Sequence, residues 1–149
     1  MRAVVNAVMY LTRSGCQWRL LPQSYPPWPT VYAYFASWSQ LGVWQAIHLS
    51  LAKMARLNQQ RRSTPSMVII DGQCVKAQYG EERGYDGFKK IRGRKRQVLV
   101  DSTGILWGAK VHRANQAEGT RALEVLHQFP KDCAIPTKLL GDSGYGKKP

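Results

Sequence analysis

Two aspartates, Asp71 and Asp142, occupy matching positions in the sequence. Each follows a short apolar segment, VIID at 68–71 and LLGD at 139–142, and each precedes a turn that contains glycine. When two strands of an α/β sheet deliver carboxylates to one edge, the pair can share a divalent cation such as Mg²⁺ or Mn²⁺. Two such ions roughly 4 Å apart activate the attacking oxygen and stabilise the leaving oxygen in phosphodiester chemistry. The pair therefore predicts a metal site with Asp71 and Asp142 as catalytic ligands.

A structural interpretation of these aspartates stays open, because aspartate at the end of a strand commonly caps the following turn. Asp101 is the useful contrast. It also ends an apolar segment, but the DSTG sequence at 101–104 is typical of an ordinary hairpin turn, so we interpret Asp101 as structural. The matched setting of the other two, in a strongly basic chain, favours the metal site.

A dense run of cations lies between the two aspartates, in YGEERGYDGFKKIRGRKRQ at 79–97. It holds seven cations and three acids, and its glycines predict a mobile loop. Tyr85 and Phe88 could stack on bases or anchor the loop. Such a run is often only a solvated surface, but beside an acidic site it favours a clamp on the phosphate backbone that does not read base sequence. The candidate DNA-binding residues are Lys89, Lys90, Arg92, Arg94, Lys95 and Arg96.

The charge balance points to a polyanionic partner. The 149 residues carry a formal net charge of +13, and residues 1–70 contain no Asp or Glu. Nucleic acid fits this surplus best, because each neutralised phosphate releases condensed counterions; a merely soluble basic protein or a membrane-surface binder is the alternative. The three cysteines form no CxxC pair, and the sequence shows neither an apolar run long enough to span a membrane nor a signal peptide. We therefore expect a cytoplasmic protein without disulfides or zinc.

Three amphipathic helices are predicted in the first part of the chain. Apolar residues at helical spacing indicate a helix over residues 1–14 that Gly15 ends. Thr30 is placed to cap a second helix that ends at Gly42. A third helix is expected over residues 43–58. Its predicted inward face consists of Trp44, Ile47, Leu51 and Met54.

The periodicity changes after a polar linker. MVII at 67–70 predicts a short buried strand that ends at Asp71, and QVLVD with ILWGAKVH predicts a hairpin. A helix over 117–128 and a strand in TKLL follow. His112 and Asn115 come at the end of the hairpin, where Asn115 could cap the helix or contact substrate. The order of elements predicts an α/β domain with a mixed sheet.

At these residues the sequence resembles the DDE transposases of bacterial insertion sequences. The segments that carry the resemblance are NAVMYLTRSGCQWRLLPQSYPPWPTVYAYFASWSQLGVW, VIIDGQCVK, RGYDGFKKIRGRKRQVLVDSTGIL and GDSGYG. The resemblance implies a catalytic domain like RNase H, with Asp71 and Asp142 as the first two members of a metal-binding triad. It also implies that the protein cuts and rejoins double-stranded DNA at element ends and target sites.

In the family pattern a third acid, a Glu on a later helix, follows the position of Asp142. The family pattern also has a few dozen residues before the position that matches Met1. We therefore expect a transposase truncated at both ends, with impaired catalysis. The expected organisation is a helical DNA-binding module in 1–60, a linker in 61–66 and a partial catalytic domain in 67–149. Self-association is left open, and no membrane partner is expected.

Three other interpretations of the resemblance remain open. The chain could be a non-catalytic DNA-binding fragment that regulates the complete transposase, or a metal-dependent nuclease without strand transfer. It could also be a decayed product that folds poorly. Lys147 and Lys148 could be encoded by a run of adenines, a slippery sequence at which ribosomal frameshifting would add the missing part.

Overall fold

A computed structural model describes residues 1–142 and 145. The chain divides into two compact units, Met1–His48 and Leu49–Pro149, and the division falls within helix α3 (Val43–Asn58). Each unit has its own hydrophobic core. Within the part of the chain that the structure describes, no helix has the length and apolarity that a bilayer crossing requires.

The first unit is helical, as the sequence predicts. Helix α1 (Arg2–Ser14) ends at Gly15, which adopts φ 67° and donates its N–H to the Leu11 carbonyl. This left-handed conformation suits glycine, so the predicted end of the helix is confirmed. A 3₁₀ turn, η1 (Trp18–Leu20), leads to α2 (Trp28–Gln40). The core consists of Val4, Ala7, Val8 and Val31, with aromatic rings packed around it.

Helix α2 begins three residues earlier than the sequence predicts, and α3 buries a different face. Pro29 in the first turn of α2 fixes a helical φ, so Thr30 lies inside the helix and does not cap it. In α3 the predicted inward residues Leu51 and Met54 are each 58% exposed. The buried residues are Ala52 and Arg56, because Arg56 makes an ion pair with a buried aspartate of the second unit.

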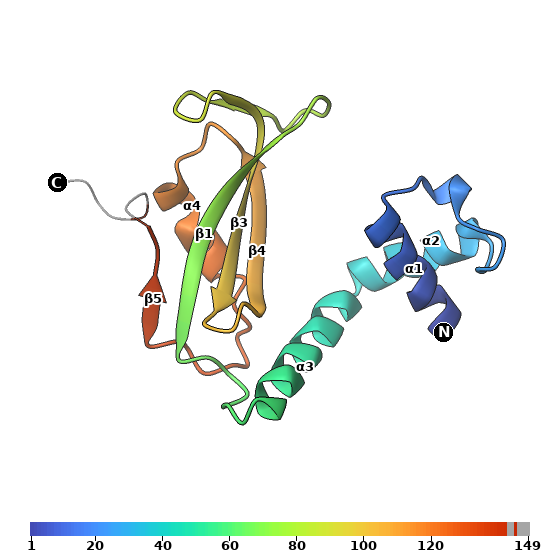
Figure 1. Ribbon diagram of the computed structural model, residues 1–149, viewed down its shortest axis with the longest axis horizontal. Helices are drawn as coiled ribbons and strands as arrows, with labels where there is room; N and C mark the ends of the chain where they lie inside the picture. Colours follow the sequence, from blue (N-terminus) through green and yellow to red (C-terminus); the bar gives the residue numbers. More distant parts are fainter. Residues whose placement is uncertain (143–144, 146–149) are drawn as a thin grey trace. The chain divides into compact units, whose positions relative to one another are not determined.

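The second unit is built on a mixed five-stranded sheet. Its strands are β1 (Met67–Lys76), β2 (Gly84–Asp86), β3 (Ile91–Asp101), β4 (Leu106–Arg113) and β5 (Lys138–Leu140). The order is β2-β3-β1-β5, and β4 pairs with β3. All pairs are antiparallel except β1 with β5, which are parallel. The α/β class and the mixed sheet predicted from the sequence are therefore confirmed (Figure 1).

Strands β1 and β3 are longer than predicted, and this changes the setting of the cationic run. Strand β1 continues past Asp71 to Lys76, paired with β3 as far as Gly93. Most of the run predicted as a mobile loop therefore lies in strands. Gly93 shows why glycine is needed there, since a Cβ at this position would lie 2.0 Å from the Val75 carbonyl oxygen. The glycine permits close strand pairing and is no sign of a mobile loop.

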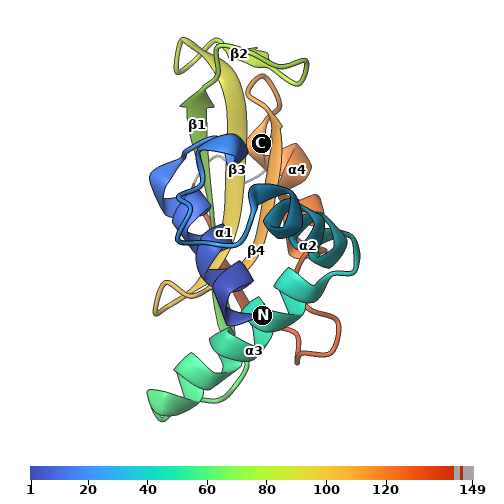
Figure 2. The same ribbon diagram turned by 90° about the vertical axis from the view of Figure 1, so that its right-hand side faces the viewer.

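Helix α4 (Glu118–Leu126) covers one face of this sheet (Figure 2). The core between them contains Val68, Ile70, Leu99, Trp107 and Val125. Side chains alternate along β3, so its odd-numbered residues, from Lys95 to Leu99, are buried toward α4. The even-numbered residues point to the opposite face of the sheet.

Candidate functional site

Asp71 lies in the middle of β1 and is exposed. Its Oδ1 accepts a hydrogen bond of 2.7 Å from the Gly72 N–H, and its strand partner is Val98. Its neighbours Ile70 and Gly72 face α4: Ile70 is buried in the core, and a Cβ on Gly72 would lie 2.8 Å from the Glu118 carboxyl carbon. Because successive side chains of a strand point to opposite faces, Asp71 faces the open side of the sheet.

Asp142 follows β5, the parallel neighbour of β1, and is also exposed. The last pair of their ladder is Ile69 with Leu140, and Asp71 and Asp142 each lie two residues further along the chain. Gly141 supports this continuation, because a Cβ on it would lie 3.1 Å from Ile70 Cγ2. Neighbouring strands are about 4.8 Å apart, and level residues in a parallel pair point to the same face. Continued two residues beyond its last pair, this register would place the two predicted aspartates level with each other.

The donor set of this pair fits a hard divalent cation. Mg²⁺ takes one or two protein carboxylates and completes its octahedron with water and phosphate oxygens. Two exposed carboxylates on adjacent strands supply such ligands and leave room for a phosphate. Among residues 1–142 and 145, no group of three or more His, Cys, Asp or Glu side chains could hold a metal ion.

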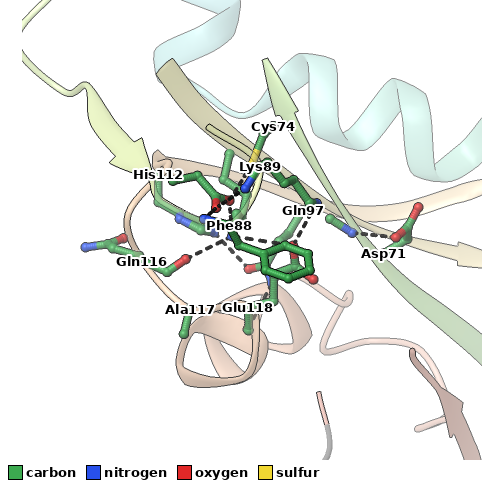
Figure 3. A network of polar contacts seen from close by, with 12 residues as sticks. Asp71, Cys74, Phe88, Lys89, Gln97, His112, Gln116, Ala117 and Glu118 are labelled. Atoms are coloured by element: carbon green, nitrogen blue, oxygen red, sulfur yellow. Dashed lines mark hydrogen bonds and ion pairs between the residues drawn. The ribbon is translucent and has the colours of Figure 1, made fainter. Parts of the chain in front are cut away.

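A buried amide that no sequence motif marks, that of Gln97, lies on the α4 side of the sheet. Gln97 is fully buried, and its Nε2 donates to the Glu118 carbonyl oxygen at 2.9 Å and to the Tyr145 hydroxyl at 3.0 Å. Its Oε1 lies 3.0 Å from His112 Nε2. Figure 3 shows Gln97, His112 and Glu118 joined in this polar network, with Asp71 to one side.

Tyr145 connects this network to the acidic pair. Burial raises the pKa of its hydroxyl to about 12; the hydrogen bond from Gln97 opposes the shift, and the negative charges of Glu118, Asp71 and Asp142 add to it. Tyr145 is therefore neutral at physiological pH and close enough to all three carboxylates to sense their charge. The sequence signal for Tyr145 was its place in GDSGYG, three residues after Asp142, but nothing there identified its partner.

A second cluster fixes the start of β3 to α4. Lys95 is 5% exposed, and its Nζ lies 3.5 Å from Asp86 Oδ2 and 3.4 Å from Glu118 Oε1. Lys89 Nζ lies 3.6 Å from the same Glu118 oxygen (Figure 3). The position of Lys95 does not fit the predicted contact with DNA phosphate, because its charge is already paired inside the unit.

Asp86 organises the turn between β2 and β3. Its Oδ1 accepts hydrogen bonds from the backbone N–H groups of Phe88 and Lys89, and its Oδ2 accepts one from the Cys74 thiol. The backbone bond from Lys89 is the main reason that the pKa of Asp86 falls to about 2. Burial, together with the hydrogen bond from the thiol to Asp86, raises the pKa of the Cys74 thiol. Phe88 itself is 96% exposed.

The other candidate cations lie on accessible surface. Arg92 and Arg96 are exposed, Arg94 is half-buried, and their alternation along β3 places them on the open face that also carries Asp71. Arg113 of β4 is paired with Arg94 in the register and is exposed on the same face. Lys90, in the turn before β3, is exposed as well. Arg113 was not singled out in the sequence, because its place beside the cationic run depends on the β3–β4 register.

The structural interpretation of Asp101 is confirmed. Its buried carboxylate accepts hydrogen bonds from Thr103 and from Trp107 Nε1, and it makes the ion pair with Arg56. The predicted cap at Asn115 is wrong, because α4 has Ala117 as its N-cap residue and no side-chain cap. Asn115 lies instead against β2, where a Cβ on Gly84 would lie 2.2 Å from its Oδ1.

Comparison with known protein families identifies the chain. Residues 62–149, more than half of its length, match the family described as Transposase DDE domain. The chain belongs to the DDE transposases. Residues 1–48 of this transposase match a second family, described as Putative transposase of IS4/5 family (DUF4096). Searches of curated proteins and of solved structures gave no match. The family places the transposase among proteins that act on DNA and use a divalent metal ion.

Proposed function

We propose that this transposase cuts and joins DNA at insertion-sequence ends with Asp71 and Asp142 as the carboxylates that hold its Mg²⁺ or Mn²⁺. The observation that supports the proposal is the parallel register of β1 and β5, whose last pair, Ile69 with Leu140, lies two residues before Asp71 and Asp142. A structural role as a turn cap fits Asp71 poorly, because it lies mid-strand and its side chain is exposed.

When bound, the metal would activate the attacking oxygen and neutralise charge on the phosphate. The chain's own residues hold the ligands and the DNA. The Gly72 N–H fixes one oxygen of Asp71, which leaves the other available to a cation. The exposure of both aspartates leaves their face of the sheet accessible to a DNA strand.

We further propose that DNA lies along the open face of the sheet, over Arg92, Arg96 and Arg113. Antiparallel partners point to the same face, so the pairing of Gln73 with Arg96 puts Arg96 close to Asp71 on the neighbouring strand. These cations would contact phosphates and position the scissile strand without reading its bases. Lys89 and Lys95 are not part of this surface, since both are ion-paired with Glu118.

The assignment of segments follows from the same chemistry. We propose a helical DNA-binding module in 1–60, a linker in 61–66 and a catalytic domain like RNase H in 67–149. The acid-free composition of the first segment supports contact with a polyanion. The mixed sheet and its pair of aspartates support the catalytic assignment of the last.

The proposal is tested by nicking of labelled element-end DNA in Mg²⁺ or Mn²⁺, with Asp71→Asn, Asp142→Asn and the control Asp132→Asn. Asp132 is an exposed aspartate whose charge is paired with Lys53 away from the site. We expect the first two variants to lose cleavage by at least about 100-fold while DNA affinity stays unchanged, and the control to keep both.

Cleavage that persists in Asp71→Asn or Asp142→Asn would refute the assignment of the metal ligands. Intact DNA binding with no cleavage by any of the proteins, the parent included, would support the alternative of a non-catalytic DNA-binding fragment. Nicking without joining would favour a nuclease.

A further inference from the structure

We propose that Gln97 and Tyr145 form a latch that positions Asp142 beside Asp71. The inference rests on the proposed metal site and adds two positioning residues to it. Neither contacts a reacting group; they act by fixing where the second carboxylate lies.

The need for a latch follows from the shortness of β5. Its ladder with β1 contains three residue pairs and ends at Leu140, two residues before Asp142. Leu139 and Leu140 are about half exposed, so little apolar burial holds this end of the strand. A carboxylate placed beyond the last ladder pair needs another constraint, since a displacement of about 1 Å impairs a preorganised site.

Tyr145 supplies that constraint from the chain just after Asp142. Its backbone N–H donates to the Asp142 carbonyl oxygen at 3.1 Å. Its ring packs against Gly141, where an added Cβ would lie 3.0 Å from Tyr145 Cδ2. The ring thus covers Gly141 on the α4 side of the sheet, opposite to the side that Asp71 faces.

Gln97 is a rigid hydrogen-bond donor to the Tyr145 hydroxyl oxygen. Because Nε2 also faces the Glu118 carbonyl oxygen, the orientation of the amide is defined, and Oε1 must be the atom that faces His112. The side chain is fully buried in β3 beneath β1, so it has no room to follow a moving partner. Satisfied buried networks of this kind specify a single geometry.

A cross-linking experiment tests the position of residue 142 without metal, DNA or catalysis. Cysteines are introduced as Asp71→Cys and Asp142→Cys in a chain whose native thiols are removed by Cys16→Ser, Cys74→Ser and Cys133→Ala. Level residues on neighbouring strands fall within the Cα separation that a disulfide requires, so we expect rapid cross-linking under mild oxidation. Failure of this parent to cross-link would overturn the proposal.

Adding Tyr145→Phe, which keeps the ring and removes the hydroxyl, should slow cross-linking about fivefold, the effect of one net hydrogen bond. Gln97→Leu should have a similar effect. Tyr85→Phe, at an exposed tyrosine of β2, is the matched control and should leave the rate unchanged. An unchanged rate in Tyr145→Phe, with a melting temperature equal to that of the parent, would refute the latch even if Gln97→Leu does not fold.

A second measurement uses the native carboxylates. Mn²⁺ titration followed by electron paramagnetic resonance should show weaker binding by Tyr145→Phe, by about fivefold, with DNA affinity unchanged. Equal Mn²⁺ affinity in the parent and Tyr145→Phe would count against the latch. Absence of Mn²⁺ binding in the parent, with cross-linking that depends on the tyrosine, would refute the metal site and leave the latch standing.

Discussion

The alternation of side chains along β3 predicts that neighbouring cations of one sequence run differ sharply in their effect on DNA binding. Arg92 and Arg96 are exposed on the open face, with Arg113 beside them on β4, whereas Lys95 is buried on the opposite face. The perturbation is therefore the triple variant Arg92→Ala, Arg96→Ala, Arg113→Ala, compared with the single variant Lys95→Met.

The expected change in the salt dependence of DNA binding follows from counterion release. Each phosphate contact contributes about 0.9 to the slope of log K against log salt, so loss of three contacts should reduce the slope by about 2.7. Between 50 and 200 mM salt, the parent should then lose about 40-fold more affinity than the triple variant. Lys95→Met should leave the slope unchanged, because this lysine already pairs with Asp86 and Glu118. The substitution should instead lower the free energy of unfolding by about 3 kcal/mol, since the buried Asp86 loses its charged partner and Glu118 loses one of two.

The assay is fluorescence anisotropy of a labelled duplex over a series of salt concentrations, with urea unfolding of each variant alongside. A slope in Lys95→Met that falls by about 0.9, the share of one phosphate contact, would refute the assignment of faces. An unchanged slope in the triple variant would show that DNA lies elsewhere.

Two further predictions concern the stability of the second unit. Arg56→Met should lower the unfolding free energy by about 3–5 kcal/mol, because it leaves Asp101 buried without its charged partner. The control Arg61→Met, at an exposed arginine, should change the unfolding free energy by less than about 1 kcal/mol. Urea unfolding of both variants measures the difference. Acid should also destabilise the unit through Asp101. Burial raises the pKa of this carboxyl, but hydrogen bonds from Thr103, and then those from Trp107 and Arg56, outweigh burial and lower the pKa to about 2. Because this pKa is depressed in the folded state, the stabilisation is complete above the unfolded pKa near 4 and disappears as the pH falls through 2. Thermal melting between pH 5 and 2 should show this loss, and Asp101→Asn should reduce the slope; an equal slope in that variant would contradict the explanation.

Sequence patterns predicted those elements whose formation depends on residues close together in the chain. The helix that ends at Gly15, the third helix at 43–58 and the hairpin around the 101–104 turn all depend on periodicity and turn chemistry within a few residues. The extent of β1 and β3 could not be obtained in this way. The sequence RGRKR has little tendency to form a strand on its own, and it does so because both neighbouring strands provide backbone partners.

The prediction of the inward face of α3 was wrong for a similar reason. An apolar stripe was available at Ile47, Leu51 and Met54, yet the helix buries Arg56, because Asp101 offers a buried carboxylate from 45 residues further along the chain. An ion pair between residues so distant in sequence leaves no local signal.

In the candidate site, too, some features are local in the sequence and others depend on long-range pairing. Residue type and setting identified Asp71 and Asp142, since an aspartate after an apolar strand is a local feature. The proposal that the two lie level rests on the β1–β5 register, and the proposed support from Tyr145 and Gln97 rests on contacts between residues distant in sequence. The alternation of β3 joins these proposals, because one strand turns Arg96 toward the proposed DNA and Gln97 toward the proposed support of the metal ligands. A one-residue shift in this strand would exchange the two roles, so the register of β3 with β1 is the property of the fold on which both proposals depend.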